Sequence, residues 1–344
     1  MGVSQIRKIC TAENLLSTIP DQGSGPAGKG VSKYTIMDCV IAAVPFTDTI
    51  KPLLAPALLK AQVQQAGFTA KAVDLNAELR QRMLTHRHWS LIVEFYKTGR
   101  LDSAIAAEIE SQIQFMADRV LADSPRMIAI SVFTYDCRWA TRWLAWEIRR
   151  RSATVEIVLG GSGLFEDGFG ESGFGKELVR LGIVNAWIRG DGDITLPGWL
   201  QGNRGAAGIM TDHWRQHTNQ QLSELAMPDY HDYSWDLYQP NAPIGIYGSR
   251  GCVRHCTFCD VHSHWPKYTW RTGDSIFEEM KKMYEEYGRR VFHFQDSLIN
   301  GNLREYRRLT TLLSEHNLAN PDQRFTWHSF FILRPESQFG DRDW

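Results

Sequence analysis

The stretch GSRGCVRHCTFCD, residues 248–260, holds three of the six cysteines in the chain. Cys252, Cys256 and Cys259 follow the spacing C-x3-C-x2-C, and Phe258 stands just before the last of them. Thiolates are soft ligands that bind zinc, copper or iron–sulfur clusters. Three thiolates are one fewer than the usual set for a structural zinc ion or a cubane cluster. The stretch therefore predicts a metal site whose last ligand comes from elsewhere.

The last ligand has two candidate sources. A histidine would complete a zinc site, and His255, His262 and His264 are close by in the sequence. A non-protein ligand would instead complete an iron–sulfur cluster with one open iron. Zinc sites usually pair two C-x2-C units, and the sequence contains no second one. The stretch also follows an expected strand, where parallel α/β folds build active sites, so a cluster is favoured over zinc.

Composition places the chain among ordinary globular proteins. Its 344 residues allow about two domains. A net charge of −1 gives no basic excess for nucleic acid, and no apolar run approaches the roughly 18 residues of a membrane span. The other cysteines, Cys10, Cys39 and Cys137, are far apart, which is not a disulfide framework. A reducing, cytoplasmic location is expected.

The first part of the chain has the alternating pattern of an α/β fold. Apolar runs predict strands at 36–44, 68–76, 127–133, 155–161 and 184–190, and helices are expected at 52–67 and 137–151. Continuous apolar strands separated by helices indicate a parallel sheet covered on both faces. We expect a doubly wound, flavodoxin-like Rossmann domain over 33–200, with a helical insertion at about 77–122. Residues 1–32 are expected to form a flexible arm, since 21–30 are rich in Gly, Pro and Ser.

The second part restarts the same pattern. Residues 201–243 lose the rhythm and are expected to be a linker. Strands are then expected at 244–249, 290–296 and 324–333, with helices at 275–288 and 302–317. This indicates about three βα units of an incomplete TIM-type barrel over 244–344. The last expected strand, RFTWHSFFIL, would form an open edge that invites pairing with another chain.

The cysteine motif resembles the signature of radical S-adenosylmethionine (SAM) enzymes, C-x3-C-x-aromatic-C. In that family the three cysteines hold a [4Fe-4S] cluster, SAM chelates the fourth iron, and an electron from the cluster cleaves SAM to a radical. The resemblance implies that Cys252, Cys256 and Cys259 are the metal ligands, with [4Fe-4S] and SAM as cofactors. It also implies that Phe258 lies near the adenine of SAM, with core packing as the alternative.

Further segments resemble the subgroup of that family with an N-terminal cobalamin-binding domain. These are 249–252, 268–280 and 292–302. In the family, the segment after the second barrel strand helps to hold the SAM amino group. Asp296 and Ser297 fall there, where many members carry Gly-Gly-Glu, and the resemblance implies a SAM contact. A cap for the helix expected near 302 is the alternative role for Asp296.

The first domain matches the landmarks of the same subgroup. Pro45 follows the first strand, Gly160 and Gly161 follow the fourth, and the run 189–193 follows the fifth. Glycines let a flat macrocycle approach the strand ends closely, so the resemblance implies that Pro45, Gly160 and Gly161 contact cobalamin. A tight turn in a domain that binds nothing is the alternative. The sequence contains no D-x-H-x-x-G, which argues against a histidine ligand to cobalt.

The resemblance implies an enzyme that cleaves SAM reductively and, with cobalamin as the methyl carrier, methylates an unactivated carbon. Flavodoxin or ferredoxin is the expected electron donor. The family barrel is longer than three βα units, so we expect a fragment, a split-gene product or a truncated copy, completed by a second polypeptide. The other interpretations are a non-catalytic cluster- or cobalamin-binding module and a zinc-binding interaction protein. His293 and His328 are expected as core histidines rather than as catalytic groups, and Arg334 as a carboxylate contact or a surface residue.

Overall fold

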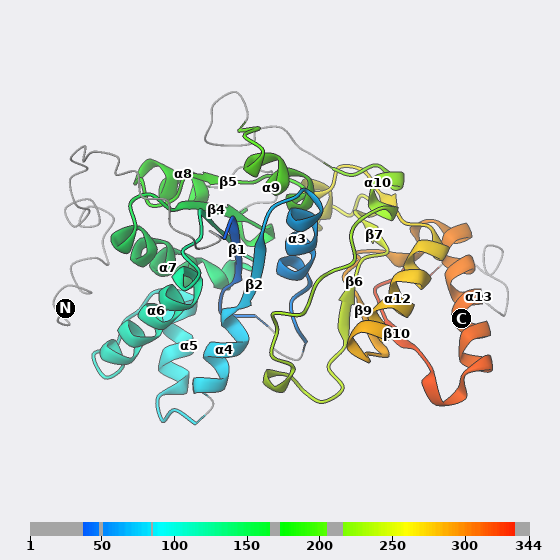
Figure 1. The fold of residues 1–344 in the computed structure, drawn as a ribbon, viewed down its shortest axis with the longest axis horizontal. Helices are drawn as coiled ribbons and strands as arrows, with labels where there is room; N and C mark the ends of the chain where they lie inside the picture. Colours follow the sequence, from blue (N-terminus) through cyan, green and yellow to red (C-terminus); the bar gives the residue numbers. More distant parts are fainter. Residues whose placement is uncertain (1–36, 48–50, 84, 166–172, 205–215, 334–344) are drawn as a thin grey trace.

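The computed structural model describes residues 37–47, 51–83, 85–165, 173–204 and 216–333. The expected N-terminal arm and Arg334 lie outside these residues. Two α/β units stand side by side, the first drawn in blue to green and the second in yellow to red (Figure 1). None of the helices in the described part of the chain combines the length and apolar character that a bilayer crossing needs.

The first unit is built on a sheet of five parallel strands. They are β1 (Cys39–Ala43), β2 (Ala70–Asp74), β3 (Met127–Ser131), β4 (Glu156–Gly160) and β5 (Ala186–Trp187). Their order, β2-β1-β3-β4-β5, is that of the flavodoxin-like doubly wound fold, which confirms the predicted class. Strands β1 and β3 are buried along their whole length, as their continuous apolar sequences predict.

Helices cover both faces of this sheet. They are α3 (Leu54–Gln65), α4 (Leu75–Met83), α5 (Trp89–Thr98), α6 (Ala106–Leu121), α7 (Arg138–Arg151), α8 (Gly173–Arg180) and α9 (Gly192–Leu200). Successive strand residues point to opposite faces, so Ile41 packs with α3 and α9, whereas Val40 packs with α4 to α8. The helices expected as an insertion thus supply part of one of the two covering layers, together with α7 and α8.

The second unit contains a smaller parallel sheet in the order β10-β9-β6. Its strands are β6 (Ile244–Ile246), β9 (Val291–Phe294) and β10 (Thr326–His328), joined through α12 (Gly273–Tyr287) and α13 (Leu303–Ala319). The sequence marks the ends of α12, since the Thr272 side chain caps its start and Gly288 ends it at a φ of 64°. This succession of parallel strands and helices is the start of a β/α barrel, as expected.

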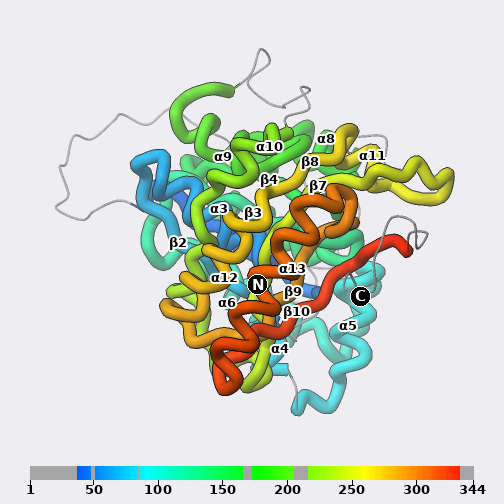
Figure 2. Tube along the Cα trace, turned by 90° about the vertical axis from the view of Figure 1, so that its right-hand side faces the viewer, coloured from blue at the N-terminus to red at the C-terminus, as the bar shows by residue number. Residues whose placement is uncertain are grey.

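A short antiparallel pair and several short helices complete the second unit. They are β7 (Ser249–Arg250), β8 (Thr269–Trp270), α10 (Asn219–Ser223) and α11 (Val261–His264). Strand β7 leads directly into the three cysteines, and α11 follows them. Figure 2 shows the yellow chain around α11 reaching out from the rest of the molecule. The cysteines therefore lie on a projecting segment that starts and ends in ordered structure.

The segment before β6, expected to be a linker, packs as a joint between the two units. Tyr230, Tyr233 and Tyr238 are buried in one core with β6, β9 and part of α3. The Tyr238 hydroxyl donates to Asp74 at 2.6 Å, and the Tyr233 hydroxyl donates to the Leu53 carbonyl at 3.1 Å. Since aromatic side chains bury large areas, this joint fixes how the second unit meets the first.

The last strand is shorter than the sequence predicts. Only Thr326–His328 pairs with β9, because the chain then turns toward the segment after β9. The Ile299 N–H donates to the Phe330 carbonyl at 3.0 Å, and the Asn300 side chain bonds both backbone groups of Ile332. The prediction of a strand over 324–333 is therefore wrong for its second half.

Candidate functional site

A cavity of about 470 Å³ lies where the two units meet. One wall is the carboxyl edge of the first sheet, including Ser131, Phe133, Gly160, Gly161 and Ser162. The facing wall comes from the second unit and includes Tyr247, Arg250, His264, Trp265, His293 and Gln295. Ligands of doubly wound sheets bind outside the carboxyl ends of the strands. This cavity is therefore the candidate site.

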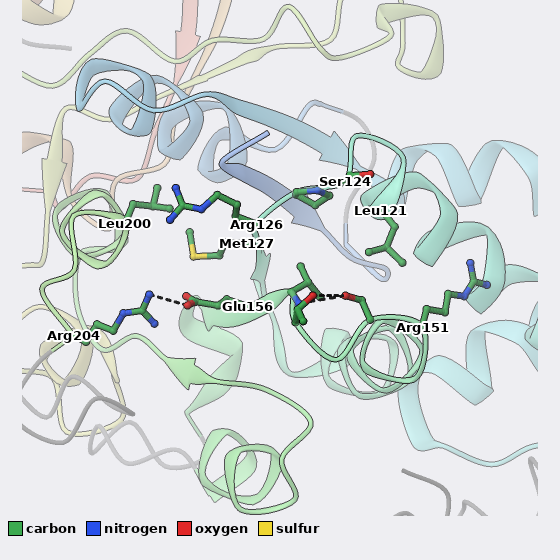
Figure 3. A pocket seen from close by; sticks show the side chains of 12 residues that line it. Leu121, Ser124, Arg126, Met127, Arg151, Glu156, Leu200 and Arg204 are labelled. Atoms are coloured by element: carbon green, nitrogen blue, oxygen red, sulfur yellow. Dashed lines mark hydrogen bonds and ion pairs between the residues drawn. The ribbon is translucent and has the colours of Figure 1, made fainter. Parts of the chain in front are cut away.

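A second cavity of about 540 Å³ opens at the opposite edge, where β3 and β4 begin (Figure 3). Its arginines are already paired with carboxylates of the protein. Arg204 meets Glu156 at 2.7 Å, and Arg126 meets Asp38 at 2.9 Å. Because the amino edge is not where such sheets bind ligands, we assign no function to this cavity.

The glycines after β4 leave the sheet edge open to the first cavity. A Cβ added to Gly160 would meet no atom within 4 Å. Gly161 has a φ of 108°, and a Cβ there would lie 2.5 Å from the Val132 carbonyl oxygen, so the backbone requires glycine. Pro45 is buried after β1 and is not among the described residues that line the cavity. The open, largely apolar edge at Gly160 fits a flat macrocycle.

The three cysteines lie on one loop between β7 and α11. Cys252 is half-buried, Cys256 and Cys259 are exposed, and all three are free thiols. The Cys259 N–H donates to the Cys256 carbonyl at 3.1 Å, and the Arg254 N–H donates to the Cys252 sulfur at 3.4 Å. The donor set of this loop, three accessible thiols free of disulfides, fits a cubane cluster.

Phe258 is 91% exposed beside these cysteines. Core packing, the alternative role considered for this ring, is therefore wrong. An exposed large aromatic ring next to a candidate cofactor site is available to cover a ligand.

Asp296 is buried at the end of β9, against the start of the cysteine segment. Its carboxylate accepts hydrogen bonds from the Gly248 N–H at 2.8 Å and the Ser249 hydroxyl at 3.0 Å. Burial raises the pKa of Asp296 to about 7, and these two residues limit the rise. The role as a helix cap is wrong, since the Asn302 side chain caps α13 instead. Asp296 thus fixes the chain just before the cysteines, and Ser297 is half-buried beside it.

An ion network that sequence reasoning missed joins the two units. Arg250, in β7, contacts Asp193 at 3.1 and 2.7 Å and Asp191 at 2.9 Å. The backbone N–H of His217 and the indole N–H of Trp265 each donate to the Asp191 carboxylate at 2.9 Å. In the sequence, Asp191 and Asp193 form a D-G-D run after a short expected strand. Their partner Arg250 comes 57 residues after Asp193, so no local pattern indicated the pairing.

Charge pairing dominates the ionisation of this network. Burial alone would raise the pKa of Asp193, but Arg250 and His217 hold it below its usual range. Burial alone would lower the pKa of Arg250, but Asp193 and Asp191 raise it. Asp191, Asp193 and His217 lie close enough together to suit a metal ion, yet the guanidinium already occupies the space between the two carboxylates.

His293, on the facing wall of the cavity, stacks on a second histidine. The rings of His293 and His328 are 4.0 Å apart at an angle of 21°. Lys51 Nζ lies 3.5 Å from His293 Nε2, and Gln295 Nε2 lies 3.3 Å from His293 Nδ1. His293 is half-buried and His328 is exposed, so the prediction of two core histidines is wrong. Of the two, His293 lines the cavity and adds a polar group to its wall.

Comparison with known proteins shows the fold of this arrangement. Two solved structures that resemble the chain are of a radical SAM methyltransferase. The enzyme is TsrM from Kitasatospora setae. Its structure with tryptophan substrate and a SAM analog (aza-SAM) matches at a TM-score of 0.53 and 17% identity, over 88% of this chain and 56% of that one. Its structure with cobalamin and a [4Fe-4S] cluster matches at 0.52 and 17%, over 89% and 56%.

A sequence relative points in the same direction. The cytidylyl-2-hydroxyethylphosphonate methyltransferase of Streptomyces wedmorensis is 30% identical over 121 residues, which are 31% of this chain and 23% of that protein. No family model matches the chain. The chain thus spans about a quarter of this relative and about half of the solved chains. The chain resembles this methyltransferase over 31% of its sequence, and it resembles the fold of a radical SAM methyltransferase over 88% of its length.

Proposed function

We propose that the chain is the cofactor-bearing part of a cobalamin-dependent radical SAM methyltransferase. Cys252, Cys256 and Cys259 would hold a [4Fe-4S] cluster, and the sheet edge at Gly160 and Gly161 would hold cobalamin. The observation that carries the proposal is the shared cavity. The open glycine edge forms one wall, and residues on both flanks of the cysteine loop form the other. Both cofactors would therefore face one space.

When bound, the cluster supplies the electron that cleaves SAM, and cobalamin supplies a carrier for the methyl group. The chain's own residues bind and orient these groups. Asp296 fixes Gly248 and Ser249, so the strand end that precedes the cysteines keeps its position. Apolar side chains such as Leu54 and Leu58 line the cavity and exclude water from it.

Phe258, Asp296 and Ser297 would form the SAM site. Phe258 is exposed and free to lie against the adenine. Both carboxylate oxygens of Asp296 already accept hydrogen bonds within the protein, so its contribution is to shape the SAM site from beneath. Ser297 is the next residue along the chain and would contribute the nearer polar group. Pro45 would support the cobalamin edge from behind, since it is buried after β1.

The substrate would be a small molecule methylated at an unactivated carbon, and flavodoxin or ferredoxin would supply electrons. The sheet of the second unit ends at β10, whose outer side pairs with no described strand. A second polypeptide would add the remaining strands there. This part of the proposal rests on the longer solved relatives, of which the chain covers 56%.

Titration of the anaerobically reconstituted chain with hydroxocobalamin, followed by reduction with SAM present, tests the proposal. We expect a shift of the cobalamin absorbance, co-elution of cobalamin with the chain, and conversion of SAM to methionine. Cluster uptake without cobalamin binding would reduce the chain to a cluster-binding module. A colourless protein that holds zinc would make it a zinc-binding interaction protein instead.

A further inference from the structure

One carboxylate of the first unit ties both ends of the cysteine loop. Asp191 Oδ1 lies 2.9 Å from an Arg250 guanidinium nitrogen and accepts a hydrogen bond of 2.9 Å from the Trp265 indole N–H. Arg250 stands two residues before Cys252, and Trp265 stands six residues after Cys259. The segment with all three cysteines is therefore closed at its base by a residue of the other unit.

Asp193 strengthens the first of these two ties. Both of its oxygens bond the two terminal nitrogens of Arg250, at 3.1 and 2.7 Å. The side chains of Arg250, Asp191 and Asp193 are only 5%, 2% and 3% exposed. A planar guanidinium held in two places keeps one orientation, and a buried pair that loses one partner is strongly destabilised.

The two aspartates also belong to the edge where cobalamin is proposed. Asp191 stands at the N-cap position of α9, without a side-chain capping hydrogen bond, and Asp193 lies in the first turn of that helix. Both line the shared cavity together with Gly160 and Gly161. Any movement of Arg250 against these aspartates changes the separation between the cysteine loop and that edge.

We propose that Asp191 and Asp193 are positioning residues that fix the distance and orientation of the cysteine loop relative to the cobalamin edge. The docking of the cysteine loop onto the first unit follows from the contacts alone. The role of this docking in setting the distance between the two cofactors rests on the function proposed above. Without the Arg250 contacts, the three thiols and the open glycine edge stay intact in their own units. The two cofactors would still bind, but they would no longer face each other at a fixed distance.

A matched control exists at the other junction of the two units. Lys60 Nζ lies 2.9 Å from Asp229 and 2.7 Å from Asp232, so it too is a buried cation between two aspartates. It joins α3 to the segment before β6 and makes no described contact with the cysteine loop. Lys60→Gln therefore removes a comparable ion triad without freeing the loop.

Hydrogen exchange on the cofactor-free chain tests the docking. The amides to follow are those of Ser263, Trp265 and Arg271, which are hydrogen-bonded on the far side of the cysteines. We expect Arg250→Gln to speed their exchange by about tenfold or more, and Lys60→Gln to leave it near the wild-type rate. Trp265→Phe serves as a milder variant should Arg250→Gln fail to fold, and it should speed the same amides. Equal exchange in the wild type and in the loop variants would overturn the docking.

Electron paramagnetic resonance on the chain that holds both the cluster and cobalamin tests whether the docking sets the distance between the two cofactors. In the wild type and in Lys60→Gln, the reduced cluster should speed the relaxation of the cobalt signal. In Arg250→Gln this effect should be lost while iron and cobalamin contents stay at wild-type levels, and Arg250→Lys should restore part of it. Unchanged relaxation in Arg250→Gln would refute the positioning role. A wild-type chain that takes up neither cofactor would refute the proposed function, and the exchange experiment would still decide the docking.

Discussion

Asp296 accepts the backbone N–H of Gly248 at 2.8 Å, and so the end of one barrel strand holds the chain that leads into the cysteines. A larger residue at 248 would displace these side chains, since a Cβ on Gly248 would lie 2.9 Å from the Asp296 carboxylate and 2.5 Å from the end of the Ile299 side chain. A buried carboxyl with few donors is also a group whose protonation is coupled to folding.

That coupling gives a pH prediction. Burial raises the folded-state pKa of Asp296 to about 7, from its ordinary value of 3.8. The folded state therefore binds this proton more tightly, and its stabilising effect is lost as the pH rises from 3.8 through about 7. The loss is on the order of a few kcal/mol. Asp296→Asn keeps an acceptor for Gly248 and removes the titration.

Urea unfolding of the wild type and of Asp296→Asn across this pH range isolates the effect of one carboxyl. We expect the free energy of unfolding of the wild type to fall relative to that of Asp296→Asn as the pH rises. Asp296→Ala should lose about 1–3 kcal/mol at any pH, because the buried Gly248 N–H loses its acceptor. Parallel pH profiles for the wild type and the Asn variant would show that Asp296 titrates normally.

Two neighbouring glycines should respond in opposite ways to substitution. Gly160→Leu would project into open space, so we expect stability near that of the wild type and a loss of hydroxocobalamin affinity of about tenfold or more. Gly161→Ala should instead lower the free energy of unfolding by about 1–3 kcal/mol, because of its positive φ and the nearby Val132 carbonyl. Thermal unfolding and cobalamin titration of both variants check this. Wild-type affinity in Gly160→Leu would place cobalamin elsewhere.

The apolar end of the second unit should drive self-association. Phe330 and Leu333, which follow β10, are 69% and 72% exposed. We expect the isolated chain to dimerise or aggregate there, and Phe330→Ser with Leu333→Ser to reduce this.

Size-exclusion chromatography with light scattering measures this association. Leu318→Ser is the matched control, since Leu318 is 79% exposed but lies on α13. An equal reduction of association by Leu318→Ser would assign the effect to general apolar exposure. A wild-type chain that elutes as a stable monomer would rule out association through this edge.

Sequence patterns located the strands but not the contacts between the units. Runs such as Cys39–Ala43 and Met127–Ser131 are apolar throughout, so their burial on both faces was readable. Strand β10 ended early because the Asn300 side chain bonds Ile332, a long-range contact that propensity does not encode.

In the candidate site too, local sequence patterns were readable, whereas long-range contacts were not. The cysteine spacing is local and was readable, as were the glycines after β4. The pairing of Arg250 with Asp193 joins residues 57 positions apart, and its residue types alone are equally typical of a surface. Asp296 was predicted as a SAM contact, but its burial and its partner Gly248 depend on how β9 meets β6. Tertiary packing decides such roles.

Iron content after anaerobic reconstitution tests the central claim most directly. We predict about four iron atoms and matching sulfide per wild-type chain, almost none in Cys256→Ser, and wild-type content in Cys137→Ser. Cys137 is the matched control, because it is a free cysteine buried in the first unit, away from the loop. Zinc in place of iron in the wild type, or wild-type iron content in Cys256→Ser, would contradict the account.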